Sequence, residues 1–277
     1  MRRILSDMCW LLLPMAVLLT LNIGGARLPT AALVPVWLLF AAAIFAGLWV
    51  RALSRRHAFL CAYMNPGSAW RERWRGGVLL ALTQLLPAAL LAALLIIAIV
   101  RVDDTFTWRL LLLNLPALVL MHALVRRALA FHVAARYLPE LSWRLTLRLN
   151  FLVLFPALAI AAMYGSYPEL ANATLKQAVW HEMARQEAVS EILMTLMRIA
   201  AAKDALGWWL GQQLLPGLGE PLFRTGGWLL LLAVEGLFLW SYLLLSAGML
   251  ELVRWRKPQP EQRRSPRPSV AGNGHSV

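Results

Sequence analysis

The chain has 277 residues, of which 60% are hydrophobic and only 15% are charged, and its net charge is +13 at pH 7. Soluble domains average about 25% charged residues, so this composition excludes an ordinary soluble enzyme or binding module. The basic residues gather between and after long apolar blocks, which is typical of membrane-orientation signals. We therefore expect the lipid bilayer to be a partner and expect no nucleic-acid partner.

Six apolar blocks are long enough to form helices that cross a bilayer, which requires about 20 residues each. They lie at residues 4–23, 31–50, 77–100, 109–125, 149–167 and 227–250. The sequence thus predicts an all-α, polytopic membrane helix bundle, a single transmembrane domain over residues 1–257. Five blocks contain proline, which we interpret as kinks within continuous spans, at Pro14, Pro35, Pro87, Pro116 and Pro156.

The first block allows two interpretations. Arg2 and Arg3, an apolar run and the small residues around Gly24 resemble the layout of a cleaved signal peptide over residues 1–26. The same block is also a possible, if mediocre, first span. The topology of the remaining spans is the same in both cases.

The distribution of arginine and lysine predicts the orientation. With the N-terminus inside, segments on the inner side hold 19 of the 27 basic residues, and segments on the outer side hold eight. Twenty-four of the 27 are Arg, a bias associated with GC-rich bacterial genomes. By the positive-inside rule we expect a bacterial inner-membrane protein with both termini in the cytoplasm. The basic tail over residues 258–277 has almost no apolar residues, and we expect it to be disordered.

Two inner loops share an order of residues that suggests a weak internal repeat. Residues 50–71 contain His, Tyr, Pro and Trp-Arg in the same order as residues 125–144. One interpretation is a duplicated helical hairpin, as in some transporters. The other is that interfacial loops favour Arg, Trp and Tyr in any case.

The outward segment, residues 168–226, has helical periodicity in its first half. We predict one amphipathic helix over Leu175–Met197. Its apolar face is formed by Leu175, Val179, Met183, Val189, Leu193, Leu196 and Met197. Either this face packs on the protein's own spans as an interfacial lid, or it docks a membrane or periplasmic protein partner. Four tryptophans are predicted interfacial anchors: Trp70, Trp143, Trp208 and Trp209.

Glu235 is the acidic residue that lies well inside a predicted span. A carboxylate inside a membrane is costly, so it indicates either a proton or ion relay or a buried polar contact between helices. Asn114 lies at a similar predicted depth and is the expected partner of Glu235. His122 and Gln84 are also intramembrane polar residues, and their predicted depths match less well.

The sequence offers no catalytic or metal-binding pattern. It has no H-E-x-x-H, no G-x-S-x-G and no C-x-x-C motif, and Cys9 and Cys61 lie far apart. We expect no catalytic residues, no metal and no cofactor. The leading hypothesis is a non-enzymatic membrane subunit or assembly factor of an envelope complex. A small transporter or channel component that uses Glu235 is the second hypothesis, and an intramembrane enzyme is the third.

Overall fold

The computed structural model describes residues 2–65, 68, 77–135, 137–164, 173–214, 217, 219–220, 226–229, 233 and 236–256. Side chains are described throughout these ranges except at residues 2–7, 161–164, 214 and 254–256. Glu235, Trp70 and residues 258–277 lie outside the described residues.

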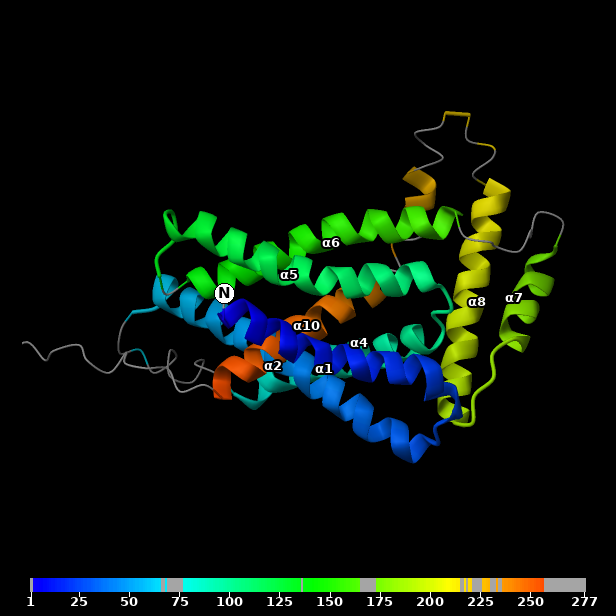
Figure 1. The fold of residues 1–277 in the computed structure, drawn as a ribbon, viewed down its shortest axis with the longest axis horizontal. Coiled ribbons are helices and arrows are strands. Elements are labelled where there is room, and N and C mark those ends of the chain that lie inside the picture. The colour runs from blue at the N-terminus through cyan, green and yellow to red at the C-terminus, as the bar shows by residue number, and fades with distance from the viewer. Residues whose placement is uncertain are drawn as a thin grey trace, which may run out of the picture.

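Six long helices form the body of the protein (Figure 1). They are α1 (Arg2–Gly24), α2 (Thr30–Tyr63), α4 (Val78–Val100), α5 (Thr105–Ala130), α6 (Leu138–Tyr164) and α10 (Gly236–Arg256). Each contains a stretch long and apolar enough to cross a membrane. The prediction of an all-α polytopic bundle is therefore confirmed, and the chain is a multi-pass membrane protein.

Several helices extend well beyond the apolar blocks that mark them in the sequence. The second block ends at residue 50, but α2 continues to Tyr63, and α6 begins at Leu138, eleven residues before the fifth block. These extensions carry polar residues, so hydropathy identifies the spans but not the helix ends. The five prolines lie inside continuous helices, as expected from the kink interpretation.

Helix α10 is the central helix of the bundle. It packs against α1, α2, α4 and α6, and its apolar window has a larger buried share than that of any other span. Its buried side chains include Leu239, Tyr242, Leu243 and Leu250. The pairs α2–α4 and α5–α6 pack as antiparallel hairpins (Figure 1). Both repeat interpretations accommodate this arrangement.

Helix α1 is a packed member of the bundle. Leu11 and Leu18 are fully buried in its core. The side-chain amide of Asn22 donates to the backbone carbonyls of Ile99 (2.9 Å) and Val102 (2.7 Å), and so caps the C-terminal end of α4. Helix α1 is one of the helices long and apolar enough to cross a membrane.

Two further helices lie at one end of the bundle and do not run along it. Helix α7 (Leu175–Ala184) and helix α8 (Glu191–Leu214) are antiparallel neighbours, and α8 runs across the ends of the long helices (Figure 1). We call this pair the α7–α8 hairpin and the end it covers the hairpin end. At this end Asp104 caps α5 by accepting from the backbone N–H groups of Phe106 and Thr107, which lowers the pKa of its carboxyl.

The crossing of α2 and α10 depends on two glycines. Gly47 and Gly248 face each other, and a Cβ on Gly248 would overlap the backbone carbonyl of Ala43. Small residues allow helix backbones to approach closely inside a membrane, where van der Waals packing is a main source of association.

We predict that Gly248→Ala lowers the free energy of unfolding by about 1–3 kcal/mol, because the new methyl group meets backbone that cannot move aside. Gly207→Ala on α8 is the matched control, since a Cβ at Gly207 meets no atom within 4 Å. Alanine there should be neutral or stabilise by up to about 1 kcal/mol. Thermal unfolding of both variants in detergent measures the difference. Equal effects would contradict the close α2–α10 contact.

Candidate functional site: the α7–α8 hairpin and a buried polar cluster

The segment predicted as one helix over Leu175–Met197 is two helices, so that prediction is wrong. Helix α7 ends at Ala184 and α8 begins at Glu191. The turn between them is fixed by contacts to the start of the chain: the N–H of Val189 donates to the carbonyl of Ala26 (2.8 Å), and the hydroxyls of Ser190 and Thr30 are 2.8 Å apart. Ser190 also accepts from the N–H of Leu193 and so caps α8.

The break divides the predicted apolar face. Leu193 and Met197 are buried in the main core of the bundle, and Val179 and Met183 are half-buried. Leu175, Val189 and Leu196 are exposed. The lid interpretation therefore describes part of the predicted face, and the rest of it is uncovered in the single chain.

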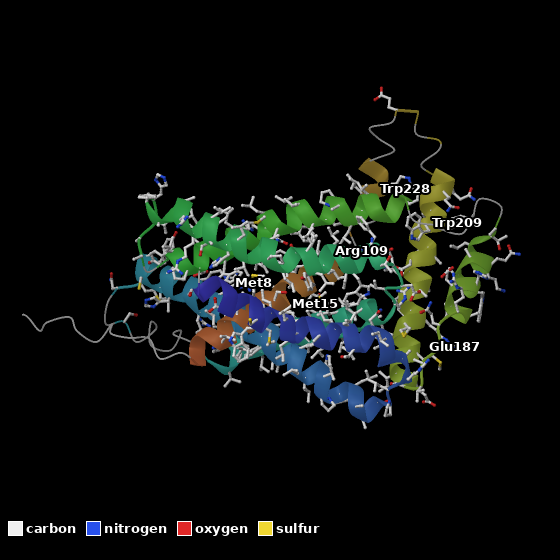
Figure 2. All side chains as sticks on the ribbon, viewed as in Figure 1. Met8, Met15, Arg109, Glu187, Trp209 and Trp228 are labelled. Atoms are coloured by element: carbon white, nitrogen blue, oxygen red, sulfur yellow. The ribbon has the colours of Figure 1, made fainter. Side chains whose placement is uncertain are left out.

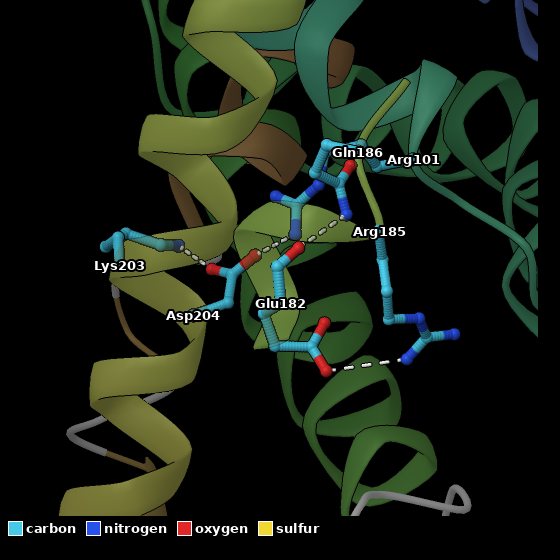
Figure 3. A network of polar contacts seen from close by, with 6 residues as sticks. All are labelled: Arg101, Glu182, Arg185, Gln186, Lys203 and Asp204. Carbon is cyan, nitrogen blue, oxygen red and sulfur yellow. Dashed lines mark hydrogen bonds and ion pairs between the residues drawn. The ribbon is translucent and has the colours of Figure 1, made fainter. Parts of the chain in front are cut away.

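The middle of α8 is attached to the end of α4 by an ion pair (Figure 3). The guanidinium of Arg101, directly after α4, lies 2.6 Å from the carboxylate of Asp204 on α8, and the ammonium of Lys203 lies 2.6 Å from the other oxygen of that carboxylate. The side chains of Arg101 and Asp204 are about four-fifths buried. One carboxylate on α8 thus contacts two cations.

The far end of α8 makes contacts through aromatic side chains. The indole N–H of Trp209 donates to the carbonyl of Ala173 (2.9 Å), and the ring of Trp208 lies 4.8 Å from that of Trp228. Trp209 and Trp228 lie together at the hairpin end in Figure 2, whereas Glu187 marks the turn between α7 and α8. Gly211 allows this contact, because a Cβ there would collide with the Trp228 ring. Helix α8 is therefore held to the bundle at its start and middle, and its far end contacts Ala173 and Trp228.

We predict that Asp204→Asn loosens the α7–α8 hairpin, because a charge-assisted contact contributes about 1.5–3 kcal/mol. The readout is the thiol-labelling rate of Ala201→Cys, a fully buried position on α8, with Cys9 and Cys61 replaced by Ser. Labelling should accelerate about tenfold or more. Glu187→Gln, which removes a carboxylate from the exposed turn, is the control and should not change the rate. An unchanged rate in Asp204→Asn would mean that the ion pair does not hold the hairpin.

A second apolar face of α8 is exposed. It is formed by Ile192, Leu196, Ile199 and Leu206, whose exposed fractions are 62%, 37%, 60% and 40%. We call these four residues the exposed α8 stripe. At 100° per residue it lies roughly 120° around the helix from Leu193 and Met197. The exposed charged residues Glu191 and Arg198 lie on a third side. The stripe therefore faces away from the bundle, and it shares its side of α8 with one exposed charged residue, Lys203.

Trp143 was predicted to be an interfacial anchor, and the structure places its side chain inside the bundle. Its side chain is 3% exposed and stacks on His122, with ring centroids 4.0 Å apart. The early start of α6 explains this burial, because it places Trp143 in a helix that packs against α5. Trp208 and Trp209 lie at the hairpin end, where they make the contacts described above.

A cluster of polar side chains is buried between α5, α6 and α10. The amide of Asn150 donates to the side-chain oxygen of Asn114 (2.8 Å), and the hydroxyl of Tyr242 donates to the carbonyl of Leu111 (2.9 Å). Toward the other end of the bundle, the Thr146 hydroxyl lies 3.4 Å from Nδ1 of His122. Pro116 cannot donate to the carbonyl of Leu112, the residue after Leu111, so it removes a backbone donor from this part of α5.

The cluster changes the predicted pairing of polar residues. Asn114 pairs with Asn150, and the proposed contact with Glu235 lies outside the described residues. Gln84 is half-buried on α4 and contacts the neighbouring Thr83, so the structure does not bring it to the cluster. Sequence reasoning missed Asn150 and Tyr242. In the sequence, Asn150 is the second residue of the fifth apolar block and so is expected to lie at the end of a span. In the structure it lies in the middle of α6.

Two atoms of the amide pair make no hydrogen bond of good geometry, namely Nδ2 of Asn114 and Oδ1 of Asn150. We predict that Asn114→Leu and Asn150→Leu each lower the free energy of unfolding by about 1–3 kcal/mol, because each leaves a buried amide without its partner. The double variant should cost no more than one single variant. Chemical unfolding in detergent provides the double-mutant cycle. Additive losses would show that the two amides do not interact.

Metal-binding geometry is not found among the residues that the structure describes, where no group of three His, Cys, Asp or Glu side chains converges. Cys9 and Cys61 are exposed and are not joined in a disulfide. Comparison with protein-family models, with curated proteins and with solved structures finds no match to this chain. The proposal below therefore depends on the geometry of the chain itself.

Proposed function

We propose that this protein is a non-enzymatic membrane subunit or assembly factor that docks another protein on the exposed α8 stripe. The observation that carries the proposal is that α8 is held to the bundle at its start and middle and still exposes large aliphatic side chains on another side. A loosely attached amphipathic helix would turn such a face toward the bundle or the lipid. A fixed helix holds the stripe available for a partner.

The energy available from covering the stripe is considerable. Burying one Leu or Ile side chain contributes about 1.5–3 kcal/mol, and four such residues follow one side of α8. In soluble proteins, contiguous exposed apolar surface marks sites of contact with a protein or a membrane. The spacing 192, 196, 199, 206 is that of residues which meet a partner helix.

The expected location of the stripe follows from the arginines. Residues in the second half of α2, at the end of α5 and at the start of α6 lie at the end opposite the hairpin (Figure 1): Arg51, Arg55, Arg56, Arg126, Arg127, Arg144 and Arg148. The positive-inside rule supports a cytoplasmic location for that end. In a bacterial inner membrane the α7–α8 hairpin then lies on the periplasmic side, where the partner would be reached.

This orientation predicts the signals of reporter fusions. Fusions after Val50, Val125 and Leu250 should report a cytoplasmic location, and fusions after Arg101 and at Gln177 should report the periplasm. Paired reporters, one active on each side of the membrane, provide the measurement. A cytoplasmic signal at Gln177 would contradict the orientation.

The docking proposal predicts that Ile199→Glu abolishes retention of a stoichiometric partner when the protein is purified from native membranes in mild detergent. Loss of one buried Ile and burial of a charge should weaken binding about tenfold or more. Arg198→Glu introduces the same side chain one residue away on the charged side and should keep the partner. Thermal unfolding of both variants should match the wild type. Equal retention by the two variants would remove the stripe as a docking site.

The buried polar cluster favours a second function, that of a small transporter or channel component. Asn114, Asn150 and Tyr242 place amide and hydroxyl groups inside the bundle, where transport sites are found. Purification in mild detergent followed by thermal unfolding distinguishes the two functions. A homogeneous single particle whose melting temperature rises with a substrate favours transport, and a stoichiometric partner favours the docking function.

A further inference from the structure

We infer that the protein docked on the exposed α8 stripe is a second copy of this chain, with the two α8 helices antiparallel. This inference rests on the proposed docking function and names its partner. Three observations carry it: the direction of α8 relative to the spans, the spacing of the stripe, and the position of the charged residues along α8.

The direction of α8 determines how two copies can meet. Two copies inserted the same way in one membrane are related by a twofold axis parallel to the spans, the commonest symmetry of oligomers. Because α8 runs across the bundle end (Figure 1), this axis makes two adjacent α8 helices antiparallel. The stripe lies roughly 120° around α8 from the residues that enter the bundle, so a neighbouring copy in the same membrane can reach it.

The spacing of the stripe sets the register. Positions 192, 196, 199, 203 and 206 alternate steps of four and three residues, as in the seam of a coiled coil. In an antiparallel pair, Leu196 of one copy meets Ile199 of the other, and Ile192 meets Lys203. Residues beside the seam are small, namely Thr195, Ala200, Ala202 and Gly207. Small flanking residues allow two helices to approach closely.

Charge complementarity supports the same register. The pairing brings Lys203 of each copy beside the first turn of the other α8, where Glu191 is exposed. Lys203 and Glu191 carry opposite charges, so a contact between them across the two copies is favourable. The twofold axis makes this contact twice. Within one chain the two residues are twelve positions apart on a helix, or about 18 Å, so they cannot pair with each other.

The test uses the full chain, labelled separately with donor and acceptor dyes and reconstituted in liposomes of phosphatidylethanolamine and phosphatidylglycerol. Energy transfer is followed as lipid dilutes the protein. Wild type should associate. Glu191→Lys and Lys203→Glu should each weaken association about fivefold or more, and the double variant should restore most of it. Rescue by the exchanged pair requires the two residues to lie in different copies. Arg198→Glu is the control, and equal thermal unfolding of all variants excludes misfolding as the cause.

Three results would overturn the inference. Association that Ile199→Glu leaves unchanged would place the contact elsewhere, and failure of the exchanged pair to restore association would remove the antiparallel register. A wild-type chain that stays monomeric would exclude the second copy. In that last case, Ile199-dependent retention of a different protein leaves the proposed docking function intact. If lipid alone covers the stripe, the chain will neither associate with itself nor retain another protein. That result overturns both this inference and the proposed docking function.

Discussion

The carboxylate of Asp204 is the contact on which the arrangement at the hairpin end depends. It lies between Arg101, which follows α4, and Lys203, its neighbour on α8. Apolar packing alone would let a helix slide or turn about its axis, because hydrophobic contact has little directional preference. An ion pair with most of its surface buried fixes one rotation of α8. Once that rotation is fixed, Leu193 and Met197 enter the core and the exposed α8 stripe is left uncovered.

The body of the fold follows from the sequence because a bilayer constrains a chain strongly. Every backbone polar group inside the membrane must be hydrogen-bonded within the protein, so a long apolar block is a helix almost regardless of its detailed composition. The six spans were predictable for this reason. The same constraint explains why α5 and α6 continue through Pro116 and Pro156, where neighbouring helices surround the break in the backbone pattern.

The hairpin was less predictable because distant contacts decide its shape. Periodicity is continuous from Leu175 to Met197, but the chain turns where Val189 and Ser190 meet Ala26 and Thr30. The residues of this segment alone do not indicate contacts with residues about 160 positions away in the sequence. Trp143 and Asn150 illustrate a related difficulty. Their burial depends on how far α6 extends before its apolar block, and hydropathy does not show that.

The buried polar cluster contributes specificity at some cost in stability. In a low-dielectric interior the Asn114–Asn150 bond fixes how α5 and α6 face each other. Tyr242 of the central helix α10 bonds to Leu111 on α5. Atoms that remain without a hydrogen bond there are costly. The cluster and the hairpin therefore have different roles. The polar cluster fixes the relative rotation of the spans. The α7–α8 hairpin determines which side chains are exposed at the hairpin end.

The account depends on α8 being a fixed part of the bundle, and amide hydrogen exchange of the wild-type chain in lipid nanodiscs tests this most directly. Because α8 is held to the bundle at its start and middle and its far end contacts Ala173 and Trp228, its amides should exchange almost as slowly as those of α4, and protection should extend along residues 194–213. The exposed turn at residues 185–188 should exchange much faster. Exchange of the α8 amides within seconds, at the rate of that turn, would show that the helix is not held and would contradict the account.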